Sequence, residues 1–341
     1  MTTGRVLGLD GGGSKTIAVV ANPLGEVESY TVSAGLDPTA GPNWEAMFTD
    51  LATQIGTIDA ATIGLPYHGE IPSVSARQTE LGAALFGANC QVVNDVAVAF
   101  EGAFAGADGV LILAGTGSMA WARGPLGTHR AGGWGDVFGD EGSAYWIGRK
   151  ALGIVSQHLD GRRASPDFTR LLLTAMQVAP ADLIGWTYGH ANPRAAIAII
   201  ARHVSALAQA GDVEAVAVMT RAASHLADLG RTAAAACGTR HPVDWSFAGG
   251  VFNDAIVLNA TMKSMHTPPL SPRLPLLVGQ CLWLPGTQDG ALSPILLPGW
   301  HPRLPRCTKP KVPDRCPRSP KPSSARSSPI GRPLCSKACR R

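Results

Sequence analysis

Two short glycine turns are the parts of this sequence best suited to hold phosphate groups. The first covers residues 11–16, GGGSKT, directly after Asp10, and the second covers residues 115–118, GTGS. Glycines allow a tight turn and let several backbone N–H groups approach an anion without a Cβ in the way. Asp10 adds a carboxylate, which is the kind of ligand that holds a hydrated Mg²⁺. The two turns therefore predict a phosphate site with a carboxylate for a metal ion.

The first turn differs from the common nucleotide-binding motifs. A Walker A loop has glycine directly before Lys-Ser/Thr and a helix after it, whereas here Ser14 precedes Lys15 and a strand-like segment follows. A dinucleotide-binding fingerprint also requires a helix after its glycines. A glycine hairpin that binds no ligand is the alternative interpretation of either turn taken alone.

Asp95 is a second carboxylate in a favourable position. It follows an apolar strand over residues 91–93 and Asn94, and an apolar helical segment over residues 96–104 comes directly after it. Ligands of open α/β sheets bind at the carboxyl ends of the strands. Asn94 and Asp95 are therefore predicted to lie at a ligand site.

Residues 132–148, GGWGDVFGDEGSAYWIG, combine glycine, tryptophan and carboxylates in one loop. An aromatic face stacks on the C–H groups of a sugar, and carboxylates accept hydrogen bonds from its hydroxyls. The second half of this stretch is predicted to open a helix with Asp140 and Glu141 in its first turn. The alternative is that these two acids only cap the helix, since acids suit a helix N-terminus. The density of these residue types favours a sugar site.

Apolar periodicity predicts the elements that position these residues. Strands are expected at residues 5–9, 16–21, 27–32, 62–65, 91–93, 110–114, 119–122 and 243–247. Helices are expected at residues 44–55, 96–104, 192–210 and 212–237, and others open at Ser75, with Gln78 completing a capping box, near Asp140 and near Asp254. Strand, glycine turn and strand occur twice, about 100 residues apart, which indicates a duplicated unit that faces one cleft.

Gly249 and Gly250 form a third glycine site between the strand at residues 243–247 and the helix that opens near Asp254. A strand, a Gly-Gly turn and a helix leave backbone bare, so that a flat adenine ring can lie against it.

The net charge of +4 comes from the end of the chain. Residues 300–341 hold 12 of the 29 Lys and Arg residues and one acidic residue, so the rest of the chain is acidic. We expect this tail to be disordered because Pro, Ser, Arg and Lys dominate it. A basic arm for nucleic acid is the alternative, but we expect no nucleic-acid partner. The sequence shows neither a signal peptide nor an apolar run long enough for a membrane, which predicts a cytoplasmic protein without a membrane partner.

These stretches together resemble the sugar kinase/heat-shock chaperone/actin superfamily. More closely, the sequence is similar to the BadF/BadG/BcrA/BcrD-type ATPases and, within them, to the N-acetylglucosamine and glucosamine kinases. The strings GGWG and GDEGSAYWIG are the most specific match. The resemblance implies an α/β fold with two ribonuclease H-like (actin-like) domains around a nucleotide cleft. The implied parts are an N-terminal domain at residues 1–108, a C-terminal domain with a helical insertion at residues 109–298, and a disordered or aberrant basic tail at residues 299–341.

The resemblance also implies an activity, the phosphorylation of N-acetylglucosamine or glucosamine at the 6-hydroxyl with ATP and Mg²⁺. Asp95 is the implied catalytic base and Asp10 the implied metal residue. The implied nucleotide-binding residues are Gly11, Gly12, Gly13, Ser14, Lys15, Thr16, Gly115, Thr116, Gly117, Ser118, Gly249 and Gly250. The implied sugar-binding residues are Asp37, Asn94, Asp95, Gly133, Trp134 and Asp140. The partner is then a small amino sugar, and a homodimer is possible because related kinases often dimerise.

Two other functions remain open from the sequence. One is an ATPase that activates a 2-hydroxyacyl-CoA dehydratase or a benzoyl-CoA reductase, which requires cysteines for an iron–sulfur cluster. The other is a sugar-sensing protein without catalysis. Met119 and Asp37 occupy positions where these kinases often have Asn, which leaves the identity of the sugar open.

Overall fold

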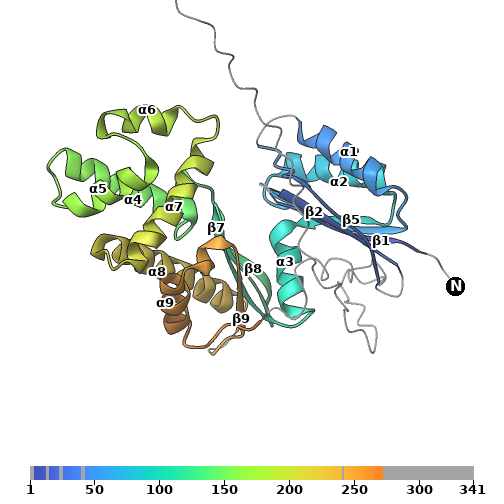
Figure 1. Ribbon diagram of the computed structural model, residues 1–341. Helices are drawn as coiled ribbons and strands as arrows, with labels where there is room; N and C mark the ends of the chain where they lie inside the picture. The colour runs from blue at the N-terminus through green and yellow to red at the C-terminus, as the bar shows by residue number, and fades with distance from the viewer. Residues whose placement is uncertain (1–3, 13–14, 23–25, 40–42, 240–241, 272–341) are drawn as a thin grey trace, which may run out of the picture. The chain divides into compact units, whose positions relative to one another are not determined.

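Apolar and β-branched strands build a mixed five-stranded sheet in the N-terminal part of the chain (Figure 1). The computed structural model describes residues 4–12, 15–22, 26–39, 43–239 and 242–271. The strands are β1 (Val6–Gly11), β2 (Lys15–Ala21), β3 (Val27–Ala34), β4 (Ala60–Leu65) and β5 (Cys90–Asn94), in the order β3-β2-β1-β4-β5. β1, β2 and β3 form an antiparallel meander, while β4 runs parallel to both β1 and β5.

Three helices accompany this sheet: α1 (Trp44–Ile55), α2 (Pro72–Phe86) and α3 (Asp95–Phe104). α1 and α2 cover a core that includes Leu7 and Leu9 of β1 and Phe48 of α1, all fully buried. Burying one large apolar side chain contributes about 1.5–3 kcal/mol to the free energy of unfolding.

Because β1, β4 and β5 are parallel, they end at one edge of the sheet, next to the start of α3.

A second mixed sheet repeats most of this topology. Its strands are β6 (Gly109–Ala114), β7 (Ser118–Gly124), β8 (Gly127–Gly132) and β9 (Trp245–Ala248), in the order β8-β7-β6-β9. β6, β7 and β8 form an antiparallel meander and β9 runs parallel to β6, as β4 does to β1. The prediction of a duplicated unit is confirmed for the strand order.

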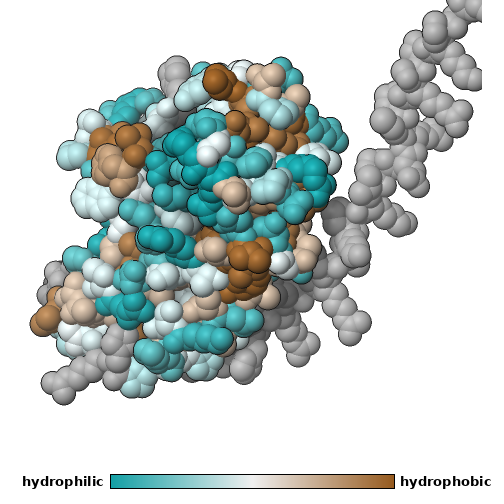
Figure 2. All heavy atoms as spheres, turned by 90° about the vertical axis from the view of Figure 1, so that its left-hand side faces the viewer, coloured by the Kyte–Doolittle hydropathy of each residue, from teal (hydrophilic) through white to brown (hydrophobic). Residues whose placement is uncertain are grey.

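Helices make up most of the chain between β8 and β9. They are α4 (Ala144–Leu159), α5 (Pro166–Met176), the 3₁₀ turn η1 (Pro180–Asp182), α6 (Leu183–Tyr188), α7 (Pro193–Gln209) and α8 (Val213–Ala236). After β9 come the 3₁₀ turn η2 (Gly250–Asn253) and α9 (Ala255–Met265). α8 packs on β6, β7 and β8, and α4 packs along α7. On the face shown in Figure 2, hydrophilic side chains are interspersed with small separate hydrophobic patches.

α3 contacts strands of both sheets and so joins the two halves of the structure. Phe100 and Phe104 are buried on it together with Leu111 of β6. Arg123 of β7 forms an ion pair of 2.5 Å with Glu101 of α3 and lies over the Phe100 ring. The predicted domain boundary at residues 108 and 109 falls between α3 and β6, and the predicted domain limits stay predictions.

Most predicted elements are confirmed within one to four residues, and three details differ. Sequence reasoning missed β8, the counterpart of β3. The predicted capping box at Ser75 is wrong, because α2 begins at Pro72 and the Gln78 side chain is buried, donating to the carbonyl of Pro66. α4 begins at Ala144 with Ser143 as its cap, so Asp140 precedes the helix and is not in its first turn. The backbone of Asp140 is left-handed, with φ of 56°, which is incompatible with a right-handed helical turn.

Within the described residues, every helix is too short or too polar to traverse a bilayer. The predicted tail at residues 299–341 lies outside the described residues.

Two glycines of α4 test how tightly α4 packs on α7. A Cβ on Gly148 would lie less than 3.0 Å from the carbonyl oxygen of Ile197, whereas a Cβ on Gly153 meets nothing within 4 Å. Gly148→Ala should therefore lower the free energy of unfolding by roughly 1–3 kcal/mol through overpacking. Gly153→Ala, the matched control, should raise it by up to about 1 kcal/mol because alanine favours helix. Urea unfolding of both variants measures this, and equal effects would contradict the packing described.

Candidate functional site

Asn94 and Asp95 lie where the parallel strands end. Asn94 caps α3, since its Oδ1 accepts from the backbone N–H of Val96 at 3.0 Å. Its Nδ2 donates to the His68 carbonyl at 3.0 Å and to Glu70 Oε1 at 3.1 Å. Asp95 Oδ1 accepts from the same Val96 N–H at 2.9 Å. Asn94 thus ties the loop after β4 to the start of α3 and holds Asp95 in the first turn.

Gly64 of β4 lies between Asp10 of β1 and Asp95 of α3. It lies opposite Asp10 in the β1–β4 register, and a Cβ on it would lie 3.1 Å from the Cα of Asp95. The missing side chain of Gly64 therefore lets the carboxylates of β1 and α3 approach each other.

Both acids have a raised pKa, and burial is the main cause for each. Burial, followed by the charges of Asp10 and Glu70, raises the pKa of Asp95 from 3.8 to about 7, although backbone N–H groups oppose the shift. Burial raises the pKa of Asp10 to about 6, and only Lys15 opposes it. Strongly shifted acids at the edge of a sheet are typical of functional sites.

The first glycine turn is partly described. Gly11 ends β1, and the Gly12 carbonyl accepts from the backbone N–H of Leu36, which brings the Asp37 loop beside the turn. Lys15 is exposed at the start of β2, and Thr16 is fully buried. Gly13 and Ser14 lie outside the described residues. The Asp37 carboxylate accepts from the N–H and the hydroxyl of Thr39, both at 2.7 Å.

The region around Asp10 fits a hydrated Mg²⁺. The Thr16 hydroxyl is buried and has no hydrogen-bond partner among the described residues. The described residues also contain no cluster of three or more acids, histidines or cysteines that would form a complete protein-made metal cage. Mg²⁺ usually takes only one or two carboxylates and completes its shell with waters and substrate phosphates. Asp10 is thus a suitable group on its protein side, whereas the strand register places the Thr16 side chain on the opposite face of the sheet.

The second glycine turn joins β6 to β7, and hydrogen bonds with the start of α4 and with Glu141 hold it. The Gly115 and Thr116 carbonyls accept from the N–H groups of Ala144 and Tyr145. Ser118 donates its hydroxyl to the Glu141 carbonyl at 2.7 Å. The first residues of α4, together with Glu141 before it, therefore hold this turn in one conformation.

Asp140 lies against this turn. Its side chain is almost fully buried, and its Oδ1 accepts from the backbone N–H of Ser118 at 3.3 Å. Its Oδ2 accepts from Arg194 at 2.6 Å. Burial raises the pKa of Asp140, and Ser118 and Arg194 oppose the rise. Asp140 is thus engaged with the phosphate turn, and its predicted contact with a sugar stays a prediction.

Gly133 and Trp134 begin the loop between β8 and α4, which also contains Asp140. The Trp134 ring is 63% exposed, and the guanidinium of Arg130 lies 5.2 Å from its centre. Arg130, on β8, pairs with Glu70 at 2.7 Å. Gly133 has a φ of +74° and donates its N–H to the Ser118 carbonyl. The Arg130–Glu70 pair therefore connects the tryptophan loop to the loop that holds Asn94.

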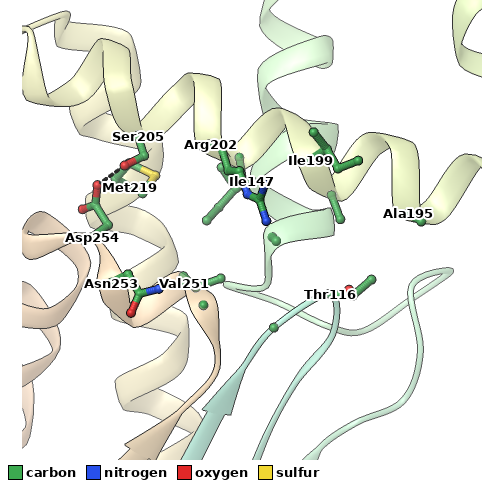
Figure 3. A pocket seen from close by; sticks show the side chains of 15 residues that line it. Thr116, Ile147, Ala195, Ile199, Arg202, Ser205, Met219, Val251, Asn253 and Asp254 are labelled. Carbon is green, nitrogen blue, oxygen red and sulfur yellow. Dashed lines mark hydrogen bonds between the residues drawn. The ribbon is translucent and has the colours of Figure 1, made fainter. Parts of the chain in front are cut away.

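A pocket of about 560 Å³ opens beside the second turn (Figure 3). Its walls come from α7, the start of α4, Met219 of α8 and the segment at residues 250–254. The predicted nucleotide residues Gly115, Thr116 and Gly250 line it, together with Arg202. At one end, Ser205 donates to Asp254, which also caps α9. The lining is mainly apolar, which suits a flat base.

Gly249 precedes Gly250, which lines this pocket. Its φ is +99°, and a Cβ there would lie less than 3.0 Å from the Ala114 carbonyl oxygen. Only glycine fits such a position. The structure thus brings the predicted Gly249–Gly250 turn to the end of β6, where the second glycine turn begins.

Sequence reasoning missed Glu70, Arg130 and Arg194. Glu70 and Arg130 carry no local sequence signal, because they meet only through the fold. Arg194, in contrast, carries a local sequence signal. It follows Pro193 in the first turn of α7, where the helix dipole disfavours a positive charge.

A family model, the BadF/BadG/BcrA/BcrD ATPase family, matches residues 7–270. Over 220 residues, the chain is 26% identical to N-acetylmuramic acid/N-acetylglucosamine kinase of Clostridium acetobutylicum, covering 61% of this chain and 72% of that protein. Over 213 residues it is 28% identical to N-acetyl-D-glucosamine kinase of Dictyostelium discoideum, covering 53% of this chain and 64% of that protein.

A solved structure is also similar. A putative N-acetylglucosamine kinase from Chromobacterium violaceum has a TM-score of 0.68 and 24% sequence identity, covering 82% of this chain and 98% of that chain. This similarity confirms the predicted fold class, an actin-like α/β fold with two mixed sheets.

The raised pKa of Asp95 predicts a cost in stability. Because its folded pKa of about 7 exceeds the ordinary 3.8, the unfolded chain gives up this proton first. The metal-free protein should therefore lose stability as the pH rises from about 4 to about 7, by at most about 1.4 kcal/mol per pH unit. Asp95→Asn removes this cost. The free energy of unfolding of the variant, relative to that of the wild type, should therefore increase as the pH rises over the same range. Urea unfolding in EDTA at pH 4.5 and pH 8 measures it, and an advantage independent of pH would contradict the assignment.

Proposed function

The chain belongs to the BadF/BadG/BcrA/BcrD ATPase family, and we propose that it is an ATP-dependent kinase for an amino sugar. The proposed acceptor is N-acetylglucosamine or glucosamine, and the proposed position is the 6-hydroxyl. The kinase names of two distant relatives support the activity and the class of sugar.

The observation that carries the proposal is the position of Asp95. It lies at the sheet edge beside Asp10, held in the first turn of α3 by the cap at Asn94. A base is most useful when its pKa is near the working pH, and about 7 meets that condition. A structural aspartate would be expected to have an ion-pair partner, whereas the charged neighbours that act on Asp95 most strongly are two further acids.

The proposed reaction is an in-line transfer. The sugar hydroxyl oxygen bonds to the γ-phosphorus as the bond from that phosphorus to the β–γ bridging oxygen breaks, and ADP leaves with the electron pair. The hydroxyl proton goes to the Asp95 carboxylate. A positioned base of this kind contributes roughly 10²–10⁴-fold to the rate.

The nucleotide is proposed to lie along the second turn with its base in the pocket of Figure 3. The N–H groups of the two glycine turns would face the phosphates, and Asp10 would face Mg²⁺. The metal ion would supply charge neutralisation on the phosphates.

The sugar is proposed to lie between Asp95 and the exposed Trp134 ring. Asn94 and the Asp37 loop, which is tied to Gly12, would complete its surroundings. The Arg130–Glu70 pair would keep the tryptophan loop close to Asp95.

A coupled ADP-release assay with a panel of amino sugars and hexoses tests this function. We expect turnover with N-acetylglucosamine or glucosamine and little with unsubstituted hexoses. Asp95→Asn should lower kcat by at least about 10²-fold, through loss of the base, while the affinity for ATP stays within a few-fold. Asp167→Asn, an exposed acid on α5, is the matched control and should leave turnover unchanged.

Two outcomes would contradict the proposal. A wild-type protein that binds ATP but phosphorylates no sugar of the panel would refute the substrate class. A folded Asp95→Asn variant that no longer binds ATP would assign Asp95 to the nucleotide site.

A further inference from the structure

Arg194 occupies a place that its local structure disfavours. It stands directly after Pro193 in the first turn of α7, where the free N–H groups of the helix already carry partial positive charge. A cation there destabilises the helix. Breaks of a local rule of this kind concentrate at functional sites.

The contacts of Arg194 leave part of its guanidinium unused. Nη2 donates to the buried Asp140 at 2.6 Å. Nε lies 3.6 Å from Asp136, beyond hydrogen-bond distance, and it is buried without a hydrogen-bond partner among the described residues. A buried donor without a partner lowers the stability of the folded protein. The side chain as a whole is 33% exposed, so the guanidinium is accessible to a ligand.

The position of this guanidinium relates it to the phosphate turn. A Cβ on Gly117 would lie 3.0 Å from Arg194 Nη2 and 2.9 Å from Asp140 Oδ2. The guanidinium therefore lies against bare backbone in the middle of the second glycine turn. The charge of Tyr67, in the loop after β4, makes the smallest of the contributions that raise the pKa of Arg194. That loop also contains His68, whose carbonyl accepts from Asn94.

We propose that Arg194 is a further catalytic residue, which binds the terminal phosphoryl group of the nucleotide and neutralises its charge during transfer. The proposal rests on the proposed kinase function. It follows from the position of the guanidinium against Gly117, in the turn predicted to hold the phosphates, and from its bond to the buried Asp140. Asp140 orients the guanidinium through Nη2. The planar fork of arginine can then bind a phosphate oxygen through a second nitrogen, a geometry that lysine does not provide.

The competing explanation is that Arg194 only neutralises Asp140. In that case, replacing Asp140 with its uncharged amide removes the need for the arginine. The decisive comparison is therefore between Asp140→Asn and the double variant Asp140→Asn/Arg194→Met, in which no unpaired carboxylate is left buried. Arg170→Met, an exposed arginine of α5, is the matched control for loss of a cation.

Calorimetric titration with Mg²⁺ and either AMPPNP or ADP gives a readout that needs no acceptor sugar. We expect Arg194→Met, alone and in the double variant, to weaken AMPPNP at least about 10-fold while ADP changes less than about 3-fold. Turnover of Arg194→Met should fall by roughly 10²-fold or more, because transition-state arginines contribute about 10³–10⁵-fold elsewhere. Arg194→Lys should recover only part of either loss.

Each other result overturns the assignment. If the double variant matches Asp140→Asn in its preference for AMPPNP over ADP, Arg194 serves Asp140 alone, while the proposed function stands. If AMPPNP and ADP weaken equally, Arg194 does not bind the terminal phosphoryl group. A wild-type protein that binds neither nucleotide overturns this inference together with the proposed function.

Discussion

The burial of two like charges beside each other is the constraint on which this structure depends. Asp10 ends β1 and Asp95 begins α3, and Gly64 between them has no side chain to separate them. The fold holds both acids in place without a neutralising cation among the residues that act on Asp95. Such an arrangement costs stability in the isolated protein and is relieved by protonation or by a cation, which agrees with the Mg²⁺ proposed beside Asp10.

Hydrogen bonds on both sides of this pair keep it in place. Asn94 uses both ends of its amide, accepting from the start of α3 and donating to the loop after β4. Glu70 of that loop continues the chain of contacts to Arg130 on β8, and Arg130 stacks on Trp134. The two sheets are thus coupled through side chains that also surround the proposed acceptor position. A shift of either sheet would alter the surroundings of Asp95.

The duplicated strands, the two glycine turns and Asp95 could be predicted from the sequence, because periodicity and glycine spacing are local signals. β8 was missed because its residues, GTHRAG, show no apolar alternation, although the duplication calls for a counterpart of β3. Asp140 was predicted in a helical turn, yet its left-handed backbone and its buried pair with Arg194 arise from contacts 54 positions apart in the chain. Contacts of this kind, like that of Glu70 with Arg130, have no local signature.

The two halves differ in what connects their third and fourth strands. Between β3 and β4 stands one helix, whereas between β8 and β9 stand α4 to α8, and α4, α7 and α8 supply walls of the apolar pocket. The walls of this pocket therefore come largely from an inserted segment, completed by Gly115, Thr116 and the segment at residues 250–254, whereas the paired acids belong to the repeated framework. Substitutions on α7 would alter the pocket without changing the strands that hold Asp10 and Asp95, so the two regions can evolve separately.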